Sequence, residues 1–287
     1  MIASAGSGRF GSPCGQILVV QGHDFQTSRV LSVRPDGRRL RVLASGLYAV
    51  WSPTGRQIVV TRVLRRRPSL QTALFLISAD GTHVRRLTHS ALADYWPTWT
   101  AEGRHVVFSC ELRANRGYLF YAPADLWKVD VRTGEERRLT ALARGGSVAF
   151  LPAPGPAGGI VFSLIRAPIR HDPSKPGADL YLRTRRGLLK RLVAGRASES
   201  VGPNALSPDR RRLLFFRRGQ GIFTLDLASR RVERLTRGRG DGAPGWSPDG
   251  RRVTFTRGTG VYVMNADGTG VARIVSGAGS GSWNARC

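Results

Sequence analysis

Lysine is nearly absent from this sequence of 287 residues. It occurs only at Lys128, Lys175 and Lys190, so 42 of the 45 basic side chains are arginines, against 19 acidic ones. The formal net charge is therefore +26. A charge of this size can attract nucleic acid, anionic lipid or an acidic polymer. Because the arginines are spread along the whole chain, a genome that favours arginine codons is the simpler explanation, and we expect nucleic acid not to be the partner.

Long apolar runs are also missing. No stretch approaches the roughly 20 apolar residues that a membrane-spanning helix needs. The N-terminal segment MIASAGSGRFGSPC lacks the apolar core of about 7–15 residues that a secretory signal requires. We therefore expect either a cytoplasmic protein or an exported one whose signal is missing from this sequence. The apolar content of 41% and charged content of 22% are typical of a folded globular protein.

Motifs that mark common catalytic and cofactor sites are not found. There is no Gly-x-Ser-x-Gly nucleophile turn, and the five histidines form no His-x-x-x-His pair. Two Gly-x-Gly-x-x-Gly stretches, at 6–11 and 240–245, do not open a helix as a dinucleotide loop must. We predict no catalytic residue, no cofactor and no metal site. The modest exceptions are two adjacent acid–base pairs, His23 with Asp24 and His171 with Asp172.

Turn motifs, by contrast, recur along the whole chain. The clearest is Trp-Ser-Pro-Asp-Gly at 246–250, and its relatives begin near residues 12, 51, 99 and 207, with a degenerate copy at Leu151-Pro152-Ala153-Pro154. Proline presets the first central position of such a turn, and glycine takes the left-handed conformation that follows. The copies divide the chain into six units that start near residues 12, 52, 100, 151, 207 and 247.

Each unit reads as four short antiparallel strands, which we term a to d. Strand a ends at the corner, and strand b follows it, as in QILVV, QIVVTRV, HVVFSCEL, GIVFSLI, RLLFF and RVTFT. Strand c leads to a second turn, often Asp-Gly, and strand d commonly reads Arg-Arg-Leu-Thr. Alternating apolar residues give each strand one buried face. Because one small sheet cannot bury both faces alone, we predict an all-β, six-bladed propeller with no helical element.

The repeated motif resembles the WD40-like Pro-Asp repeat of TolB-type propellers. The resemblance is carried by Trp-Ser-Pro-Asp-Gly, a following strand such as RRVTF, and the hairpin VYVMNADGT. It covers essentially the whole chain, but unit four lacks both turns, and we expect no counterpart of the α/β domain that precedes the propeller in TolB. The resemblance implies a non-catalytic binding scaffold in the cell envelope, periplasmic or extracellular, with a cytoplasmic location as the alternative.

The two ends of the chain are predicted to meet. We expect residues 1–11 to be an extension and residues 12–287 to form a single domain. Unit one has no room for a strand a before its corner, and aligning Trp283 with Trp51 and Trp246 makes the tail 275–287 the missing strand. In this alignment Cys287 falls beside Cys14. A disulfide between them would indicate an oxidising compartment, and two unpaired thiols are the alternative. Cys110, inside a predicted strand, is expected to be buried.

A binding site is predicted on the face that carries the b–c loops. These loops are long in units two, three and four, reading RRRPSLQ, RANRGYLFYAPA and RAPIRHDPSKPG, and short in units five and six. Long loops on a rigid scaffold commonly hold binding sites. A d–a loop, HSALADYW, lies near them. The candidate binding residues are Arg65, Arg66, Arg67, Trp96, Arg113, Arg116, Tyr118, Tyr121, Arg166, Arg170 and His171.

Three functions remain open from the sequence. The first is a monomeric scaffold that binds a protein or an acidic ligand through these arginines and aromatic residues. The second is a propeller enzyme, a lyase or hydrolase of an acidic saccharide, that would use the His-Asp pairs at the channel mouth. The third is electrostatic binding of a polyanion, which would depend steeply on salt. Tolerated insertions with solvated arginines are the alternative to a site.

Overall fold

A computed structural model of the chain describes residues 15–22, 27–66, 68–113, 122–166, 178–194, 199–200 and 205–284. In this part of the chain nearly all regular structure is β-strand. Its helical segments are two three-residue 3-10 turns, η1 (Ala143–Gly145) and η2 (Pro156–Gly158). No helix of the described residues has the length and apolar character needed to cross a membrane. The prediction of an all-β protein is confirmed.

The strands follow the predicted order, and we group them in units. Unit one has β1 (Ile17–Gln21), β2 (Arg29–Val33), β3 (Arg41–Ser45) and β24 (Ala278–Trp283). Unit two has β4 (Leu47–Trp51), β5 (Gln57–Arg65), β6 (Gln71–Ser78) and β7 (Arg85–Arg86). Unit three has β8 (Asp94–Trp99), β9 (His105–Glu111), β10 (Ala124–Asp130) and β11 (Glu136–Arg138).

The second half of the chain continues in the same way. Unit four has β12 (Val148–Pro154), β13 (Ile160–Ile165), β14 (Asp179–Arg183) and β15 (Leu189–Val193). Unit five has β16 (Glu199–Ser200), β17 (Arg212–Arg217), β18 (Gly221–Asp226) and β19 (Val232–Arg234). Unit six has β20 (Asp241–Trp246), β21 (Arg252–Arg257), β22 (Gly260–Asn265) and β23 (Ala272–Ser276).

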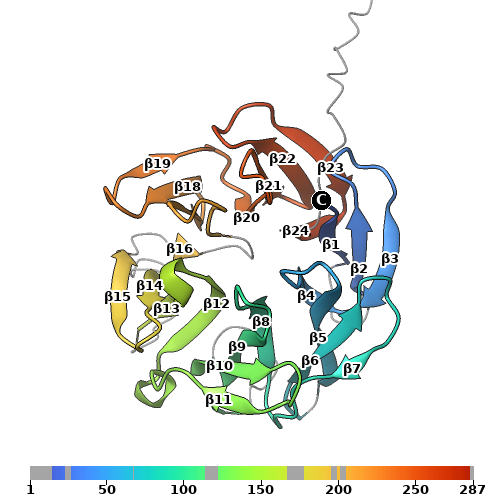
Figure 1. Cartoon of the computed structure of the whole chain (residues 1–287), viewed down its shortest axis with the longest axis vertical. Helices are drawn as coiled ribbons and strands as arrows, with labels where there is room; N and C mark the ends of the chain where they lie inside the picture. Colours follow the sequence, from blue (N-terminus) through green and yellow to red (C-terminus); the bar gives the residue numbers. More distant parts are fainter. Residues whose placement is uncertain are drawn as a thin grey trace, which may run out of the picture.

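The sheets are arranged around a common axis (Figure 1), with β4, β8, β12, β20 and β24 nearest the middle. Units one, two, five and six are separate four-stranded sheets, and units three and four belong to one eight-stranded sheet. In the strand ladder of this sheet the two units are linked by one parallel pair, Ala124 opposite Val148, between β10 and β12. Within each unit the strands pair antiparallel in the order a, b, c, d.

The C-terminal strand lies in the sheet of the N-terminal unit. β24 pairs antiparallel with β1, with Ile17 opposite Trp283. The backbone N–H of Asn284 continues this pairing by donating to the carbonyl of Gln16 (2.7 Å). The tail therefore occupies the strand a position of unit one, as its alignment with the other tryptophan-containing strands predicts.

The Ser-Pro corners of units five and six are each held by their serine and their aspartate. In unit six the Ser247 hydroxyl accepts the backbone N–H of Arg252 (2.9 Å) and donates to Asp249 (2.6 Å). Asp249 also accepts the backbone N–H of Arg251 (3.0 Å). Ser207 of unit five uses the same pattern. These contacts satisfy backbone donors within the turn, which explains why a local motif marks each strand pair.

In units two, three and five, the threonine that follows strand d satisfies a backbone donor of strand c. The hydroxyls of Thr88, Thr140 and Thr236 accept the backbone N–H groups of Leu74, Leu126 and Ile222, each at 3.0 Å. The threonine therefore completes the hydrogen bonding of strand c where strand d has ended. This recurring contact gives the repeated threonine a structural reason.

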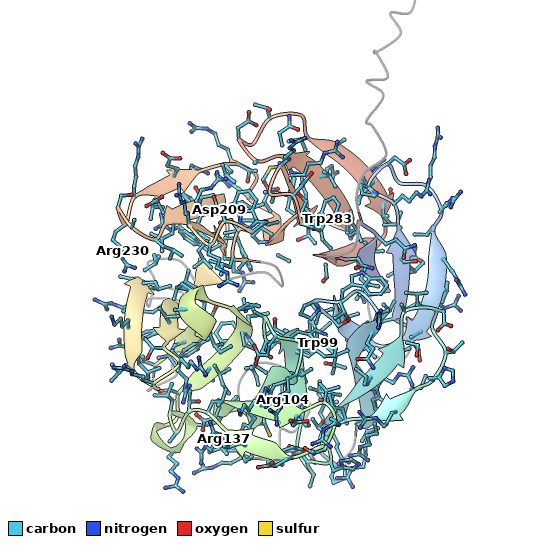
Figure 2. All side chains as sticks on the ribbon, in the orientation of Figure 1. Trp99, Arg104, Arg137, Asp209, Arg230 and Trp283 are labelled. Atoms are coloured by element: carbon cyan, nitrogen blue, oxygen red, sulfur yellow. The ribbon has the colours of Figure 1, made fainter. Side chains whose placement is uncertain are left out.

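The core lies between neighbouring units. One cluster joins Val59 and Leu74 of unit two to Trp99 and Phe108 of unit three. The Trp99 indole N–H donates to the carbonyl of Val50 in the preceding unit (3.3 Å). Another cluster joins unit six to unit one and contains Trp283, which is 3% exposed. Both tryptophans lie nearer the middle of the molecule than Arg230, which is at its edge (Figure 2).

The turns at the a–b corners and between strands c and d form one face, which we term the corner face. There, a glycine of one unit often lies against strand d of the unit before it. A Cβ atom on Gly81 would lie 2.6 Å from the carbonyl oxygen of Leu43, and one on Gly268 would lie 2.6 Å from that of Leu235. Gly37 is placed in the same way against Ile274, across the two chain ends.

In two units an arginine side chain contacts the equivalent strand d carbonyl. The carbonyls of Leu139 and Leu192 occupy the strand d position of Leu43, and they accept hydrogen bonds from Arg183 (2.9 Å) and Arg230 (3.0 Å) of the following units. Some of the arginines therefore join neighbouring sheets. Codon preference alone does not explain these positions.

Two local predictions were wrong. The degenerate corner predicted at 151–154 lies inside β12, and the turn follows at 155–159, where the Gly155 N–H donates to the carbonyl of Gly159 (2.8 Å). The pairing of β12 with β13 shifts between Phe150 and Ala153, so Pro152 sits at a bulge, where a strand tolerates proline. The second error concerns Trp96, which was placed in a loop but lies in β8.

Candidate functional site on the loop face

The face opposite the corners, which we term the loop face, carries the ends of the b strands. β5 ends at Arg65, β9 ends at Glu111 and β13 ends at Ile165. The predicted residues Arg65, Arg66 and Arg113 follow or complete these strands, and their side chains are exposed. The described arginines of units two and three therefore lie exposed at the ends of the b strands, and their role in binding stays a prediction.

Arg166 also lies at this face but is partly engaged. Its Nη2 atom is 3.6 Å from Asp179 Oδ2, and its guanidinium carbon is 5.3 Å from the centre of the Tyr181 ring. Asp179 is also 3.7 Å from Arg191. Because Arg166 already has an acidic neighbour within its own unit, it is less free to bind an acidic ligand than Arg65 or Arg113.

The remaining predicted residues lie outside the described part of the chain. These are Arg67, Arg116, Tyr118, Tyr121, Arg170 and His171, the acid–base residues His23, Asp24 and Asp172, and the cysteines Cys14 and Cys287. Their roles, and the disulfide, stay predictions. Among the described residues no group of three or more His, Cys, Asp or Glu side chains could hold a metal ion.

Trp96 is not an exposed loop residue but part of a buried floor beneath this face. It is 8% exposed and packs in a cluster with Leu70, Ala93 and Tyr95. The pairing of β8 with β9 shifts between Tyr95 and Thr98, so Trp96 lies at a bulge. Its backbone has φ = 48°, in the left-handed region. Bulky residues rarely adopt this conformation, which costs on the order of 1–3 kcal/mol.

The same bulge recurs in the neighbouring inner strands. Tyr48 in β4 has φ = 48° and Leu151 in β12 has φ = 49°, and the strand pairing shifts at both positions. In unit six the equivalent residue is Ala243, with φ = 43°. Bulges re-aim side chains and are common beside functional sites. In units two to four they involve large residues.

These bulges bring aromatic rings from three units together. The Trp96 ring centre is 5.7 Å from that of Tyr48 and 5.6 Å from that of Phe150, and Tyr95 lies 5.5 Å away. The rings are tilted, a favourable arrangement for aromatic pairs. Burial raises the pKa of Tyr48 to about 12, although a hydrogen bond from Trp96 opposes the shift. Tyr48 is therefore neutral at physiological pH.

Two carboxyl groups are buried in the same region. Asp94 is fully buried at the start of β8, where its Oδ2 accepts a hydrogen bond from the Thr88 hydroxyl (2.6 Å). Burial raises the pKa of Asp94 to about 7, while the hydrogen bonds from Thr88 and Cys110 oppose that shift. Glu111 is 2% exposed, and its carboxyl group raises the pKa of Tyr95 beyond the effect of burial. We term Tyr48, Asp94, Tyr95, Trp96, Glu111 and Phe150 the aromatic–acid cluster.

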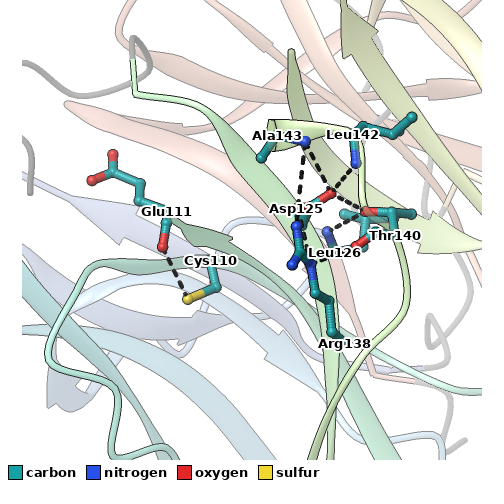
Figure 3. Close-up of polar contacts among 8 residues, drawn as sticks. All are labelled: Cys110, Glu111, Asp125, Leu126, Arg138, Thr140, Leu142 and Ala143. Atoms are coloured by element: carbon teal, nitrogen blue, oxygen red, sulfur yellow. Dashed lines mark hydrogen bonds and ion pairs between the residues drawn. The ribbon is translucent and has the colours of Figure 1, made fainter. Parts of the chain in front are cut away.

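Other buried aspartates at this face have an arginine partner. Asp125 in β10 accepts from the Thr140 hydroxyl (2.6 Å), from the Leu142 N–H (2.8 Å) and from Arg138 (Figure 3). Asp241 is held by the guanidinium of Arg257 at 2.6 and 3.0 Å. Among the described residues Asp94 forms no such ion pair. Its raised pKa therefore distinguishes it from acids that serve only to join strands.

Cys110 is buried beside Asp94, as predicted for a small apolar side chain. It is 7% exposed, lies opposite Asp94 in the β8–β9 pair, and has no disulfide partner. Its thiol contacts the backbone carbonyl of Glu111 (3.5 Å; Figure 3). Burial and the neighbouring acid raise its pKa, so the thiol stays protonated and unreactive.

Of the aromatic–acid cluster, the sequence indicated only Tyr95 and Trp96, through the segment HSALADYW. Tyr48 and Phe150 lie within ordinary strand patterns, and their contacts depend on three units meeting. One signal was available. Trp96 and Leu151 each precede a proline, and a proline within a strand marks an edge or a bulge.

Solved structures reveal what the fold is similar to, whereas no family model and no curated protein matches the sequence. TolB from Acinetobacter baumannii aligns over 94% of this chain and 66% of its own, with 18% identity and a TM-score of 0.72. TolB from Agrobacterium tumefaciens aligns over 94% of this chain and 91% of its own, with 20% identity and a TM-score of 0.63. The chain has a TolB-like propeller fold.

Other structures with this TolB-like propeller fold have different functions. An oligogalacturonate lyase in complex with manganese aligns over 87% of this chain and 71% of its own, with 13% identity and a TM-score of 0.56. At such identities the likeness concerns the fold alone. The function of the TolB-like chain must therefore be argued from its own residues.

Proposed function

We propose that this protein is a six-bladed TolB-like propeller, completed by its C-terminal strand, that binds a protein or an acidic ligand on its loop face. In this proposal units one to six are the blades, and β24 completes the first. The binding surface lies over units two to four, and the protein is a monomeric, non-catalytic scaffold of the cell envelope. The envelope location rests on the TolB-like fold.

The observation that carries the proposal is the floor of the aromatic–acid cluster. Three adjacent inner strands adopt a left-handed bulge, which brings Tyr48, Trp96 and Phe150 into contact beneath the exposed Arg65 and Arg113. Such strain persists only where the surrounding structure holds it, and it is concentrated at binding and catalytic sites. A rigid aromatic floor with a cationic rim suits an acidic partner that also presents an apolar group.

The test compares two variants of equal charge. The rim variant carries Arg65→Ser, Arg66→Ser and Arg113→Ser. The control variant carries Arg38→Ser, Arg186→Ser and Arg251→Ser, which removes three exposed arginines from the corner face. Each protein is immobilised and exposed to an envelope extract of the source organism at about 150 mM salt, where charges further apart than about 8 Å are largely screened.

A partner that the wild type and the control variant retain, but the rim variant loses, supports the proposal. Equal retention by both variants would locate binding elsewhere. Equal loss from both would show that net charge alone attracts the partner, which is the polyanion alternative. The enzyme alternative has no support beyond the shared fold, because its histidine and aspartate candidates lie outside the described residues.

A further inference from the structure

The corner face carries two cavities between neighbouring units. One, of about 560 Å³, lies between units one and two and is lined by Gln16, Arg34, Arg41, Gly55 and Asp80, among others. The other, of about 590 Å³, lies between units two and three. Its lining includes Gln57, Arg85, Gly103, Asp130 and Arg132. We term them the first and second corner clefts.

The two clefts are copies of one arrangement. Gln16 and Gln57 each precede the first isoleucine of a strand b. Arg41 and Arg85 each lie two residues before the equivalent strand d leucines, Leu43 and Leu87. Each arginine donates to a backbone carbonyl in the c–d turn of the next unit, Arg41 to Asp80 (3.2 Å) and Arg85 to Val131. These bonds fix the guanidinium groups at the clefts.

Positive charge exceeds negative charge in both clefts. Arg34 and Arg41 in the first, and Arg85 and Arg132 in the second, form no ion pair with a described residue. Asp80 instead accepts the backbone N–H (2.9 Å) and hydroxyl (2.6 Å) of Thr82 in its own turn. In the second cleft Asp130 is bound by Arg104 (2.8 Å) and by backbone groups of its turn. The carboxyl groups of Asp80 and Asp130 already have hydrogen-bond partners, so they do not neutralise the arginines that form no ion pair within the described part of the chain.

The fold does not require this pairing of glutamine and arginine. At the position of Gln16 and Gln57, the other four units have His105, Gly159, Arg212 and Arg252. At the position of Arg41 and Arg85, they have Arg137, Lys190, Glu233 and Ala272. Only the first two units combine a glutamine with a strand d arginine. The glutamine–arginine pair occurs only where unit one meets unit two and where unit two meets unit three. Because the other units pack without this pair, its presence points to a ligand.

We propose that the two corner clefts together bind an extended acidic peptide, with one carboxylate in each cleft. Guanidinium groups bind planar carboxylates with paired hydrogen bonds, and the glutamine amides can bond the peptide backbone beside them. Val42 and Val84 next to the two arginines are 51% and 47% exposed. They offer apolar contacts to peptide side chains. This site is independent of the loop face, and so of the proposed function above.

The probe is a fluorescein-labelled eight-residue peptide that alternates glutamate and valine, titrated with the full chain at about 150 mM salt. Binding is read by fluorescence anisotropy. The double variant Arg41→Ser/Arg85→Ser should weaken binding by about tenfold or more, because it removes a charge-assisted contact from each cleft. The double variant Gln16→Ala/Gln57→Ala should also weaken it, without any change of charge. Circular dichroism confirms that each variant is folded.

The matched control is Arg137→Ser/Lys190→Ser, which removes the cations at the same strand d position in units three and four. It should leave the affinity within about twofold of the wild type. An equal loss in this control would overturn the proposal in favour of net charge. No binding of the peptide, or binding of trigalacturonate in its place, would also overturn it.

Discussion

At the scale of single residues, Asp94 is the most unusual, because its carboxyl group lies where a charged group is normally unfavourable. It is a fully buried carboxyl group that forms no ion pair with a described arginine, whereas Asp125 and Asp241 each form one. A buried acid of this kind avoids the cost of burying a charge by remaining protonated. Its pKa near 7 means that both forms exist at physiological pH.

The substitution Asp94→Asn should therefore change how stability depends on pH. In the wild type the folded state holds the proton up to about pH 7, while the unfolded state releases it near pH 3.9. Between these values the folded state binds more protons, so the contribution of Asp94 to the unfolding free energy falls as the pH rises. Below pH 4 this contribution no longer changes.

Urea denaturation at pH 5.5 and pH 8 measures the effect. The wild type should lose stability relative to Asp94→Asn between these two values, and Asp267→Asn, in an exposed turn, should follow the wild type. The same pH dependence in wild type and Asp94→Asn would show that Asp94 is ionised throughout the range.

At the scale of elements, features fixed by residues close together in the sequence could be predicted, whereas contacts between units could not. The b strands and their corners were predicted well, because Ser247 and Asp249 satisfy the turn from within five residues. Unit four was misread, because its turn consists of glycines around Pro156 and has no serine or aspartate. The burial of Trp96 could not be foreseen, since its partners Tyr48 and Phe150 come from other units.

The packing of one sheet against the next can be tested at the c–d turns. Gly268 and Gly134 both have positive φ, of 88° and 77°, but only Gly268 lies against a neighbouring strand. Either Gly→Ala substitution should cost on the order of 1–2 kcal/mol for the backbone conformation. Gly268→Ala must also displace the Leu235 carbonyl, so it should lower the unfolding free energy by a further 1 kcal/mol or so.

Chemical denaturation of the two variants side by side gives the comparison. Since Gly134 has no atom within 4 Å of an added Cβ, its variant isolates the cost of the backbone alone. If the two variants were equally stable, the contact between strand d and the following turn would not hold the units together.

At the scale of the whole molecule, the arginines are spread along the chain, but their contacts differ from place to place. The net charge of +26 arises from arginines throughout the chain, but these arginines have several roles. Arg183 and Arg230 join neighbouring units, Arg138 and Arg257 neutralise buried aspartates, and Arg41 and Arg85 line the corner clefts. Substituting one arginine at a time should therefore distinguish those that stabilise the fold from those that bind a ligand. A change in net charge alone does not make this distinction.

The contact between the chain ends should determine the stability of the molecule as a whole. β24 supplies unit one with its inner strand, and Trp283, 3% exposed, packs against residues of units six and one. A chain that ends at Ser276 would lose this strand and expose both neighbours. Losing a buried tryptophan alone costs about 3–5 kcal/mol, so we expect the melting temperature to fall by about 10 °C or more.

Thermal unfolding followed by circular dichroism measures this fall, and a peptide of residues 277–287 provides the control. Added to the shortened chain, the peptide should restore part of the lost stability in proportion to its concentration, because it binds only the folded state. A scrambled peptide should have no effect, and neither peptide should stabilise the full chain. A shortened chain that melts with the full one would show that the C-terminal strand is dispensable. The pairing of β24 with β1 would then not be what keeps units six and one together.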